Sequence, residues 1–451
     1  MADSIADRIG HGVLSPLQAS LLVVNTAIGS GIFGLPWALK EAGLLVGIAI
    51  MLLLALLNLF AHHALIDCGL LAKKYRFEDM SHFALGRTGD VLLNFALTIN
   101  GLGCCISYLL IIGDTITPVA QTVLGADAWW STRNVVIIGF AVVVIFPLLF
   151  FKTIAPLSKP SALSIVCIPI IMLVVGIKGL EQRATAPPSA GNDDGIVMIG
   201  RGVLSAIGII AFSFGSTQTT FSTFASLAEP TIQRWGVTAT IATLTILIIY
   251  LSFSILGYLC FGTLVQSNIL NNFASDDAWA NFARILMAVS ILLTYPMQFY
   301  PLRDFINDLL GQRIGRGFAE TAKCYCTSLV LFCITIQVST VVTDLGFVYQ
   351  LVGTCASALL SFLLPSAIYL ATHLEWWSYV RRLVTAAGRV QPAEVTPVLE
   401  QQSAQDLMDD EIAKVPDTAW RQIALSVFTL IFGLVMCTIG TSVILINRLS
   451  K

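Results

Sequence analysis

Long apolar stretches alternate with short polar segments along most of the chain, and each stretch is long enough to cross a ~30 Å hydrocarbon core as a helix. Charged or turn-forming segments at 73–79, 186–195 and 271–277 mark some of the boundaries between stretches. The pattern predicts an all-α integral membrane protein with eleven transmembrane helices. We expect these helices at 17–38, 43–66, 91–113, 134–151, 160–178, 198–226, 237–261, 281–300, 324–343, 347–371 and 422–446.

Two of the predicted helices are interrupted by small and polar residues. The first contains NTAIGSGIFGLP at 25–36, and the sixth contains a similar segment from Ser213 to Gln218. A glycine inside a helix costs about 1 kcal/mol relative to alanine, and irregular backbone within a membrane survives only when buried in protein or lining a wet cavity. Broken helices 1 and 6 therefore predict a site for a polar ligand, although glycines that merely permit tight helix packing are the alternative.

The two interruptions lie five helices apart, which predicts an inverted repeat. Because five is odd, the second group of five helices enters the membrane from the side opposite to the first. The repeats are expected at 17–178 and 198–371, with an extra C-terminal eleventh helix at 422–446. Residues 1–16 are predicted to form a cytoplasmic tail, and the acidic segment within 372–421 a cytoplasmic loop.

Composition and charge narrow the function classes. Hydrophobic residues make up 56% and charged residues 12% of the chain, against about 25% charged residues in soluble domains. The net charge of −2 without a long basic run argues against nucleic acid as a partner. Lys and Arg concentrate in the loops assigned to the inside, so the N-terminus is predicted to be cytoplasmic.

The remaining chemistry-bearing residues do not suggest an enzyme. The five histidines are scattered or adjacent, and no cluster of nucleophiles is apparent. His62 and His63 point about 100° apart on a helix, so we interpret them as interfacial anchors rather than a shared ligand set. No metal site is predicted beyond a possible sodium site, and the cysteines are expected to pack between helices.

Several motifs, in order along the chain, resemble the amino acid/auxin permease family, particularly its sodium-coupled neutral amino acid transporter branch. They are NTAIGSGIFGLPWALKEAG (25–43), YLLIIGDTITP (108–118), TYPMQFYPLRD (294–304) and DLGFVYQLVGTCASALLSFLLPS (344–366). The resemblance implies eleven helices in the fold of bacterial sodium-coupled amino acid symporters, with helices 1–5 and 6–10 as the repeats. It also implies sodium ligands at the asparagine matching Asn25 and at a threonine of the eighth helix.

A zwitterionic amino acid requires partners for a carboxylate and an ammonium. Free backbone N–H groups at the first break suit the carboxylate, unwound carbonyls at the second break suit the ammonium, and nearby polar side chains line the side-chain pocket. The predicted substrate-binding residues are Gly29, Ser30, Gly31, Ser213, Phe214, Gly215, Gln218, Thr219, Asn100 and Tyr108, with Ser107 also considered. Interhelical hydrogen bonding is the alternative role for the residues of the third helix.

The predicted coupling ion is sodium, which needs several oxygen ligands but no dedicated carboxylate. The expected ligands are Asn25, the Ile28 carbonyl, and Thr294 or Ser290 on the eighth helix. No Asp or Glu lies deep in a predicted helix, which disfavours a proton carrier and a cationic substrate. Asp114 and Glu229, near helix ends, are the alternatives for proton coupling.

These observations favour a secondary active transporter of neutral amino acids, coupled to sodium by symport with alternating access and using no other cofactor. A proton-coupled transporter, a vacuolar or lysosomal exporter, and an amino-acid-sensing receptor on the same fold are the alternatives. The expected location is the plasma membrane or a vacuolar or lysosomal membrane. The predicted partners are an amino acid and the lipid bilayer. Protein partners stay unassigned, and residues 390–417 are interpreted as a solvated linker, with a regulatory or partner-binding role as the alternative.

Overall fold

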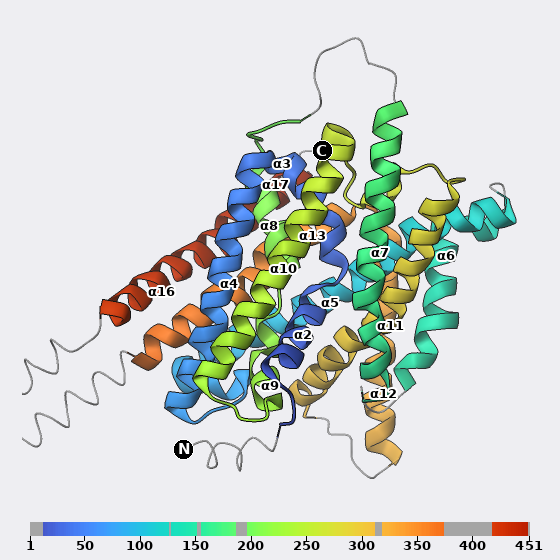
Figure 1. The fold of residues 1–451 in the computed structure, drawn as a ribbon. Coiled ribbons are helices and arrows are strands. Elements are labelled where there is room, and N and C mark those ends of the chain that lie inside the picture. Colours follow the sequence, from blue (N-terminus) through green and yellow to red (C-terminus); the bar gives the residue numbers. More distant parts are fainter. Residues whose placement is uncertain are drawn as a thin grey trace, which may run out of the picture.

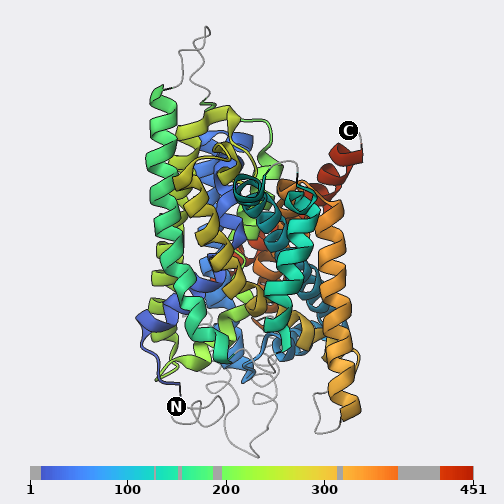
Figure 2. The same ribbon diagram turned by 90° about the vertical axis from the view of Figure 1, so that its right-hand side faces the viewer.

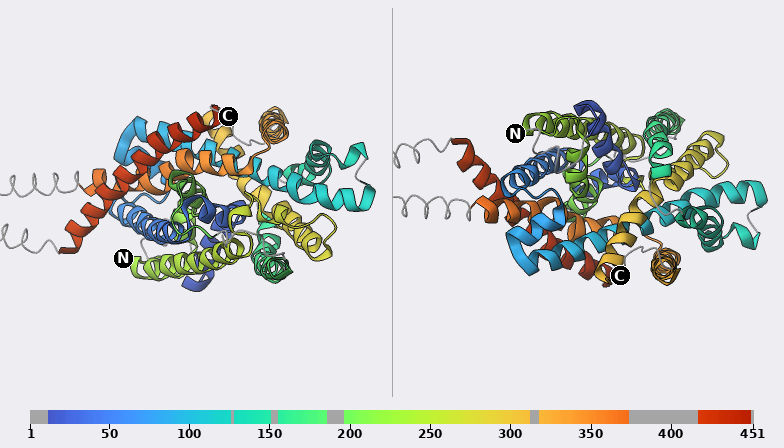
Figure 3. Two further views of the ribbon diagram at one scale, coloured as in Figure 1. Left: turned by 90° about the horizontal axis from the view of Figure 1, so that it is seen from above. Right: turned by 90° about the horizontal axis from the view of Figure 1, so that it is seen from below.

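The computed structural model describes residues 12–125, 128–150, 155–185, 196–311, 318–373 and 417–449. Within these ranges every regular element is helical, apart from one isolated parallel bridge between Leu14 and Leu227. Most of the long helices run side by side, with α2 beginning at the lower end and α17 lying at the upper end in Figures 1 and 2. Viewed along the helices, the molecule is elongated in outline (Figure 3).

The elements of the first half follow one another with short connections. They are α2 (Pro16–Ala27), η1 (Ser30–Gly34), α3 (Leu35–Ala42), α4 (Leu44–Ala72), α5 (Phe77–Leu124), η2 (Trp129–Ser131), α6 (Arg133–Phe140), η3 (Ala141–Ile145), η4 (Phe146–Phe150) and α7 (Ala155–Thr185). A capping box at Ser15 starts α2, because Ser15 and Gln18 each accept a hydrogen bond from the other's backbone N–H, and Pro16 occupies the first turn.

The second half begins with another interrupted helix. Its elements are α8 (Val203–Ser213), η5 (Thr217–Thr219), α9 (Thr220–Ser226), α10 (Ile232–Phe261), η6 (Gly262–Leu264), η7 (Ile269–Asn272), α11 (Ala278–Leu309), α12 (Phe318–Val341), α13 (Leu345–Val352), η8 (Gly353–Ser357), η9 (Leu359–Leu363), α16 (Asp417–Val435), η10 (Met436–Gly440) and α17 (Thr441–Leu449). The helix that starts with α13 continues to His373.

Within the described residues, seven helices are long and apolar enough to cross a membrane, and the bent pair Pro16–Ala27 and Ser30–Ala42 makes eight if it is counted as one span. A helix lies at each position where the sequence predicts a span. The largest difference is at α5 (Phe77–Leu124), where a kink at Gly86, whose backbone is not helical, separates a short preceding helix from the long helix that covers the predicted span at 91–113. The predicted acidic loop lies almost wholly outside the described residues, at 374–416, as do residues 1–11 of the predicted tail.

The outer surface and the helix contacts both suit a bilayer. Large apolar side chains such as Leu56, Leu173 and Ile248 are more than half exposed on the outside of the molecule, where lipid would cover them. Glycine permits close crossing inside: a Cβ at Gly353 would overlap the carbonyl of Gly208 in α8. Backbones therefore approach closely around the interrupted α8.

Candidate functional site

The first break separates α2 from η1. Helix α2 ends at Ala27, η1 begins at Ser30, and the two halves of the bent pair meet at 57°. The side chain of Ser30 is 2.7 Å from Ser107 Oγ on α5, and its carbonyl accepts a 2.6 Å hydrogen bond from the Tyr349 hydroxyl. The break is therefore fixed to α5 and α13 by polar contacts at one residue.

The second break lies between Ser213, which ends α8, and Thr220, which begins α9. The Phe214 carbonyl accepts a 2.9 Å bond from Asn58 Nδ2. The Tyr250 hydroxyl on α10 lies 2.7 Å from the Ser213 carbonyl and 2.6 Å from the Ala27 carbonyl. Because one hydroxyl carries one proton, Tyr250 shares it between the carbonyls that end α2 and α8.

The two breaks also touch directly. A Cβ placed on Gly31 would lie 2.6 Å from Ser213 Oγ and 2.9 Å from Ser213 Cα. Real side-chain carbons do not approach other atoms this closely, so only glycine at position 31 allows the contact. The small residues that the sequence places at positions 29–31 thus bring one break against the other.

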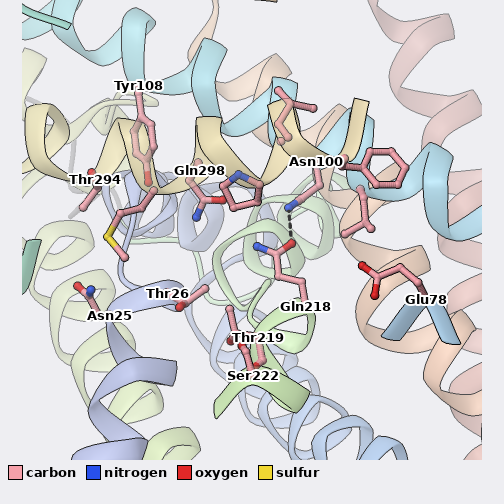
Figure 4. Close-up of a pocket in the computed structure, with 16 residues that line it drawn as sticks. Asn25, Thr26, Glu78, Asn100, Tyr108, Gln218, Thr219, Ser222, Thr294 and Gln298 are labelled. Carbon is pink, nitrogen blue, oxygen red and sulfur yellow. Dashed lines mark hydrogen bonds between the residues drawn. The ribbon is translucent and has the colours of Figure 1, made fainter. Parts of the chain in front are cut away.

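A cavity of about 390 Å³ lies next to the two breaks (Figure 4). It is lined by Asn25, Thr26, Glu78, Leu97, Asn100, Gly101, Tyr108, Gln218, Thr219, Ser222, Thr294, Met297, Gln298, Pro301, Leu302 and Phe305. Asn100 Nδ2 donates a 3.1 Å bond to Gln218 Oε1 across it. Four carboxamide side chains and one carboxylate therefore face this space, and most of the remaining wall is apolar.

Some of the predicted site residues line the cavity and others do not. Among the predicted substrate residues, Asn100, Tyr108, Gln218 and Thr219 line it, and the predicted ion ligands Asn25 and Thr294 do so as well. The other predicted residues do not line it, and most of them are buried behind its wall. They are Ile28, Gly29, Ser30, Gly31, Ser213, Phe214, Gly215 and Ser290. Ser107 bonds to Ser30, which is the interhelical role named as the alternative.

Several residues at the breaks escaped the sequence analysis. Asn58, Tyr250 and Tyr349 bond to unwound carbonyls, and Ser357 Oγ donates a 3.3 Å bond to Asn100 Oδ1. Asn58 carried a signal that was available: together with His62 it forms an i, i+4 polar pair within an apolar helix, which indicates a buried polar contact. The tyrosines carried none, because an aromatic residue is ordinary in such a helix.

The prediction that His62 is an interfacial anchor is wrong. Helix α4 continues to Ala72, well beyond the predicted end at 66, so His62 lies inside the bundle with 1% of its surface exposed. Its Nδ1 is 2.8 Å from Thr220 Oγ1 and its Nε2 is 3.1 Å from Ser216 Oγ. His62 therefore belongs to the second break.

The two carboxylates named for proton coupling already have arginine partners. Asp114 Oδ1 is 3.1 Å from Arg133 Nε, and Glu229 Oε2 is 2.8 Å from Arg234 Nη2. Neither residue lines the cavity. Glu78 does line it, with its side chain about half exposed and 3.6 Å from Arg76 Nε.

Comparison with known proteins gives one family and a consistent set of relatives. The family described as "Transmembrane amino acid transporter protein" matches residues 12–387. "Putative sodium-coupled neutral amino acid transporter 11" of Rattus norvegicus is 28% identical over 371 residues, which cover 82% of this chain and 80% of the rat protein. "Vacuolar amino acid transporter 2" of Saccharomyces cerevisiae is 26% identical, covering 77% and 74%. "Sodium-coupled neutral amino acid transporter 7" of Xenopus laevis is 25% identical, covering 81% and 85%.

Proposed function

Because this chain belongs to the transmembrane amino acid transporter family, we propose that it is a secondary active transporter of neutral amino acids, driven by sodium symport. Its named relatives are transporters, so it is not an enzyme. The observation that carries the proposal is the contact between two broken helices beside a cavity lined by four carboxamides. Broken helices that meet within a membrane supply backbone donors and acceptors to a polar solute.

The substrate is proposed to bind where the two breaks meet. Backbone N–H groups at Ser30 and Gly31 would receive the carboxylate, and carbonyls at Ser213, Phe214 and Gly215 the ammonium. The Gly29 N–H, also named for the carboxylate, donates to the Ala27 carbonyl at 2.8 Å. The Ser213 carbonyl accepts one side-chain bond, from Tyr250, and its second lone pair can accept another. The Phe214 carbonyl already accepts bonds from Asn58 and Ser216. The existing bonds support the proposal because they fix the direction in which these oxygens point.

The lining of the cavity supports a neutral substrate. Asn100 and Gln218 face each other across it, and Asn25 and Gln298 add two further carboxamides. Amides donate and accept hydrogen bonds without selecting a charge. The carboxylate of Glu78 is separated from these groups at the right of Figure 4 and is partly solvated.

The proposed sodium site uses Asn25, the Ile28 carbonyl, Ser290 and Thr294. Asn25 and Thr294 line the same side of the cavity (Figure 4), and Ser290 lies one turn before Thr294 on α11, where its carbonyl accepts a 2.9 Å bond from Thr294 Oγ1. Proton coupling is the alternative. Neither Asp114 nor Glu229 lines the cavity, so the geometry of the cavity favours the sodium ligands over these two carboxylates.

The proposed architecture is eleven membrane-spanning helices in a five-plus-five inverted repeat, followed by one extra helix. The break after Ala27 in the first predicted helix and the break after Ser213 in the sixth support it. We propose a cytoplasmic N-terminus from the distribution of Lys and Arg. The relatives include a vacuolar and several sodium-coupled transporters, so both the plasma membrane and a vacuolar or lysosomal membrane are proposed locations.

Uptake by the purified protein in liposomes tests this function. Labelled glutamine and alanine are offered under an imposed sodium gradient, an imposed proton gradient, or neither. Uptake that follows the sodium gradient is the expected result. Uptake that follows the proton gradient alone would overturn the sodium assignment. Specific binding of these amino acids without uptake under any gradient would overturn transport in favour of a receptor.

A further inference from the structure

Two polar side chains of α4 that do not line the cavity reach the second break. Asn58 and His62 lie one turn apart and therefore share a face of the helix, and both are almost fully buried. Asn58 contacts the carbonyl of Phe214, the first residue after α8, and His62 contacts Ser216 and Thr220. Their three hydrogen bonds therefore hold the unwound segment at its start, near its middle and at its end.

The hydrogen-bond pattern determines how the His62 ring binds. Thr220 Oγ1 donates its proton to the Thr217 carbonyl at 2.6 Å, so it accepts from a protonated Nδ1 of His62. In the neutral ring, Nε2 is then an acceptor, and the Ser216 hydroxyl shares its one proton between Nε2 at 3.1 Å and the Phe214 carbonyl at 3.3 Å. The His62 carbonyl accepts a 3.0 Å bond from Trp235 Nε1 of α10, which fixes the helix behind the ring. The ring thus makes one donating and one accepting bond to the segment.

These contacts favour one conformation of the segment over others. A polar side chain buried in an apolar helix is destabilising unless it is hydrogen-bonded, and the partners of Asn58 and His62 are all in 214–220. If the segment moved away, both side chains and the Phe214 carbonyl would lose these partners. The free-energy cost of leaving these buried polar groups without hydrogen-bond partners therefore opposes any rearrangement of the unwound backbone.

The held segment carries residues that face the cavity. Gln218 and Thr219 lie between the two points that His62 contacts, and both line the cavity. Gln218 points across it to Asn100 (Figure 4). Asn58 and His62 themselves do not line it, so they can act on a bound solute only through this segment.

We propose that Asn58 and His62 are positioning residues that hold segment 214–220 in the conformation that binds the substrate. The proposal rests on the transport function proposed above. Losing either residue reduces the fraction of molecules in which segment 214–220 has the conformation that binds the substrate. The apparent affinity for the substrate falls by that same fraction. The effect therefore lies in KM, while the rate at saturating substrate changes little.

The test compares four variants by uptake of labelled glutamine into liposomes. His62→Ala and Asn58→Ala each raise KM by about tenfold, because a buried partner is left unsatisfied, and the maximal rate stays within about twofold. His62→Asn places an amide where Nδ1 lies, keeps the bond to Thr220, and restores KM to within about threefold. His63→Gln is the matched control: the neighbouring residue points about 100° away, and its KM stays unchanged.

Hydrogen exchange measured by mass spectrometry on the same preparations gives an answer that does not depend on transport. Peptides that cover 214–220 exchange faster in His62→Ala and Asn58→Ala than in the unaltered protein or in His63→Gln. A KM and an exchange rate unchanged by both alanine variants would overturn the proposal. Faster exchange without any uptake by the unaltered protein would leave the positioning role intact and overturn the transport function instead.

Discussion

The two broken helices differ in what maintains their irregular backbone. At the first break, neighbouring atoms crowd the chain: Gly31 lies against Ser213, and Gly29 lies near the hydroxyl of Tyr108. At the second break, side chains of α4 and α10 donate hydrogen bonds to the unwound backbone: Asn58 bonds to the Phe214 carbonyl and Tyr250 to the Ser213 carbonyl. Neighbouring helices donate hydrogen bonds to both breaks, since Tyr349 bonds to Ser30 and Tyr250 bonds to Ala27. The comparison shows that the first break also depends on glycine at position 31 for its close approach to Ser213.

The largest effect is expected from enlarging the crowded residue of the first break. Gly31→Leu forces the two breaks apart, since even its Cβ would be 2.6 Å from Ser213 Oγ. Overpacking of this kind costs 1 to 3 kcal/mol or more, so the initial uptake rate should fall by about 100-fold. The measurement is glutamine uptake, with insertion checked by the amount of protein recovered in the liposomes.

Gly139→Leu is the control for Gly31→Leu. A Cβ at Gly139 has no other atom within 4 Å, so the same substitution should leave uptake within about twofold of the unaltered protein. Normal uptake by a correctly inserted Gly31→Leu protein would disprove the carboxylate assignment at the first break.

A smaller loss is expected from removing the donor that joins both breaks. Tyr250→Phe leaves the carbonyls of Ala27 and Ser213 without the hydroxyl they share. One unsatisfied buried group costs about 1 to 3 kcal/mol, and we expect KM for glutamine to rise by about tenfold. Tyr258→Phe on the same helix removes a hydroxyl that bonds to Val197, away from the breaks, and its KM should not change.

An equal KM in the two tyrosine variants would mean that the Tyr250 hydroxyl does not organise the breaks. If instead Tyr250→Phe raised KM and Gly31→Leu did not reduce uptake, hydrogen bonding would control both breaks, and the distinction between them would fail.

The positions of the helices and breaks followed from the sequence, because both depend on local residue patterns. The length of an apolar stretch predicts a helix, and the glycine-containing segments at 25–36 and 213–218 indicated where the first and sixth predicted helices are interrupted. The residues that stabilise the second break could not be predicted in the same way. Asn58 lies 156 positions from Phe214 and Tyr250 lies 37 positions from Ser213, and a single sequence gives no sign of such pairing.

The error at His62 has the same origin. Assigning it to an interface required the end of the second predicted helix, and helix ends are poorly defined when the apolar run fades gradually, as it does from 66 to 72. The sequence singled out Asn100 and Gln218, and both line the cavity, while their contact with substrate stays a prediction. Their mutual hydrogen bond across the cavity appeared only in the structure.

The next prediction concerns the sodium dependence of uptake, and it tests whether the end of α2 binds the ion. Asn25→Ala removes a proposed sodium ligand from the cavity wall, so half-maximal activation should require about fivefold more sodium, which corresponds to loss of roughly 1 kcal/mol of binding. KM for glutamine measured at saturating sodium should stay within about twofold. Uptake as a function of sodium concentration gives both values.

Ser222→Ala provides the control for Asn25→Ala, because Ser222 lines the same cavity and is not a proposed ligand. Its sodium activation should equal that of the unaltered protein. Identical sodium dependence in Asn25→Ala would remove Asn25 from the proposed ion site and leave the first break with a role in substrate binding alone.

The smallest expected effect tests crowding at Gly29. A Cβ there would lie 3.0 Å from the Tyr108 hydroxyl oxygen, which must move by a few tenths of an ångström, so Gly29→Ala should raise KM for glutamine by only about threefold. Removing the hydroxyl with Tyr108→Phe creates the space that the added methyl group needs. The double variant should therefore show a KM closer to that of Tyr108→Phe than the sum of the two single effects predicts. Additive effects would mean that Gly29 is needed for its backbone conformation or for contact with the substrate, and not for clearance from α5. In that case, close packing would explain less of the first break, and the two breaks would be more alike than their packing indicates.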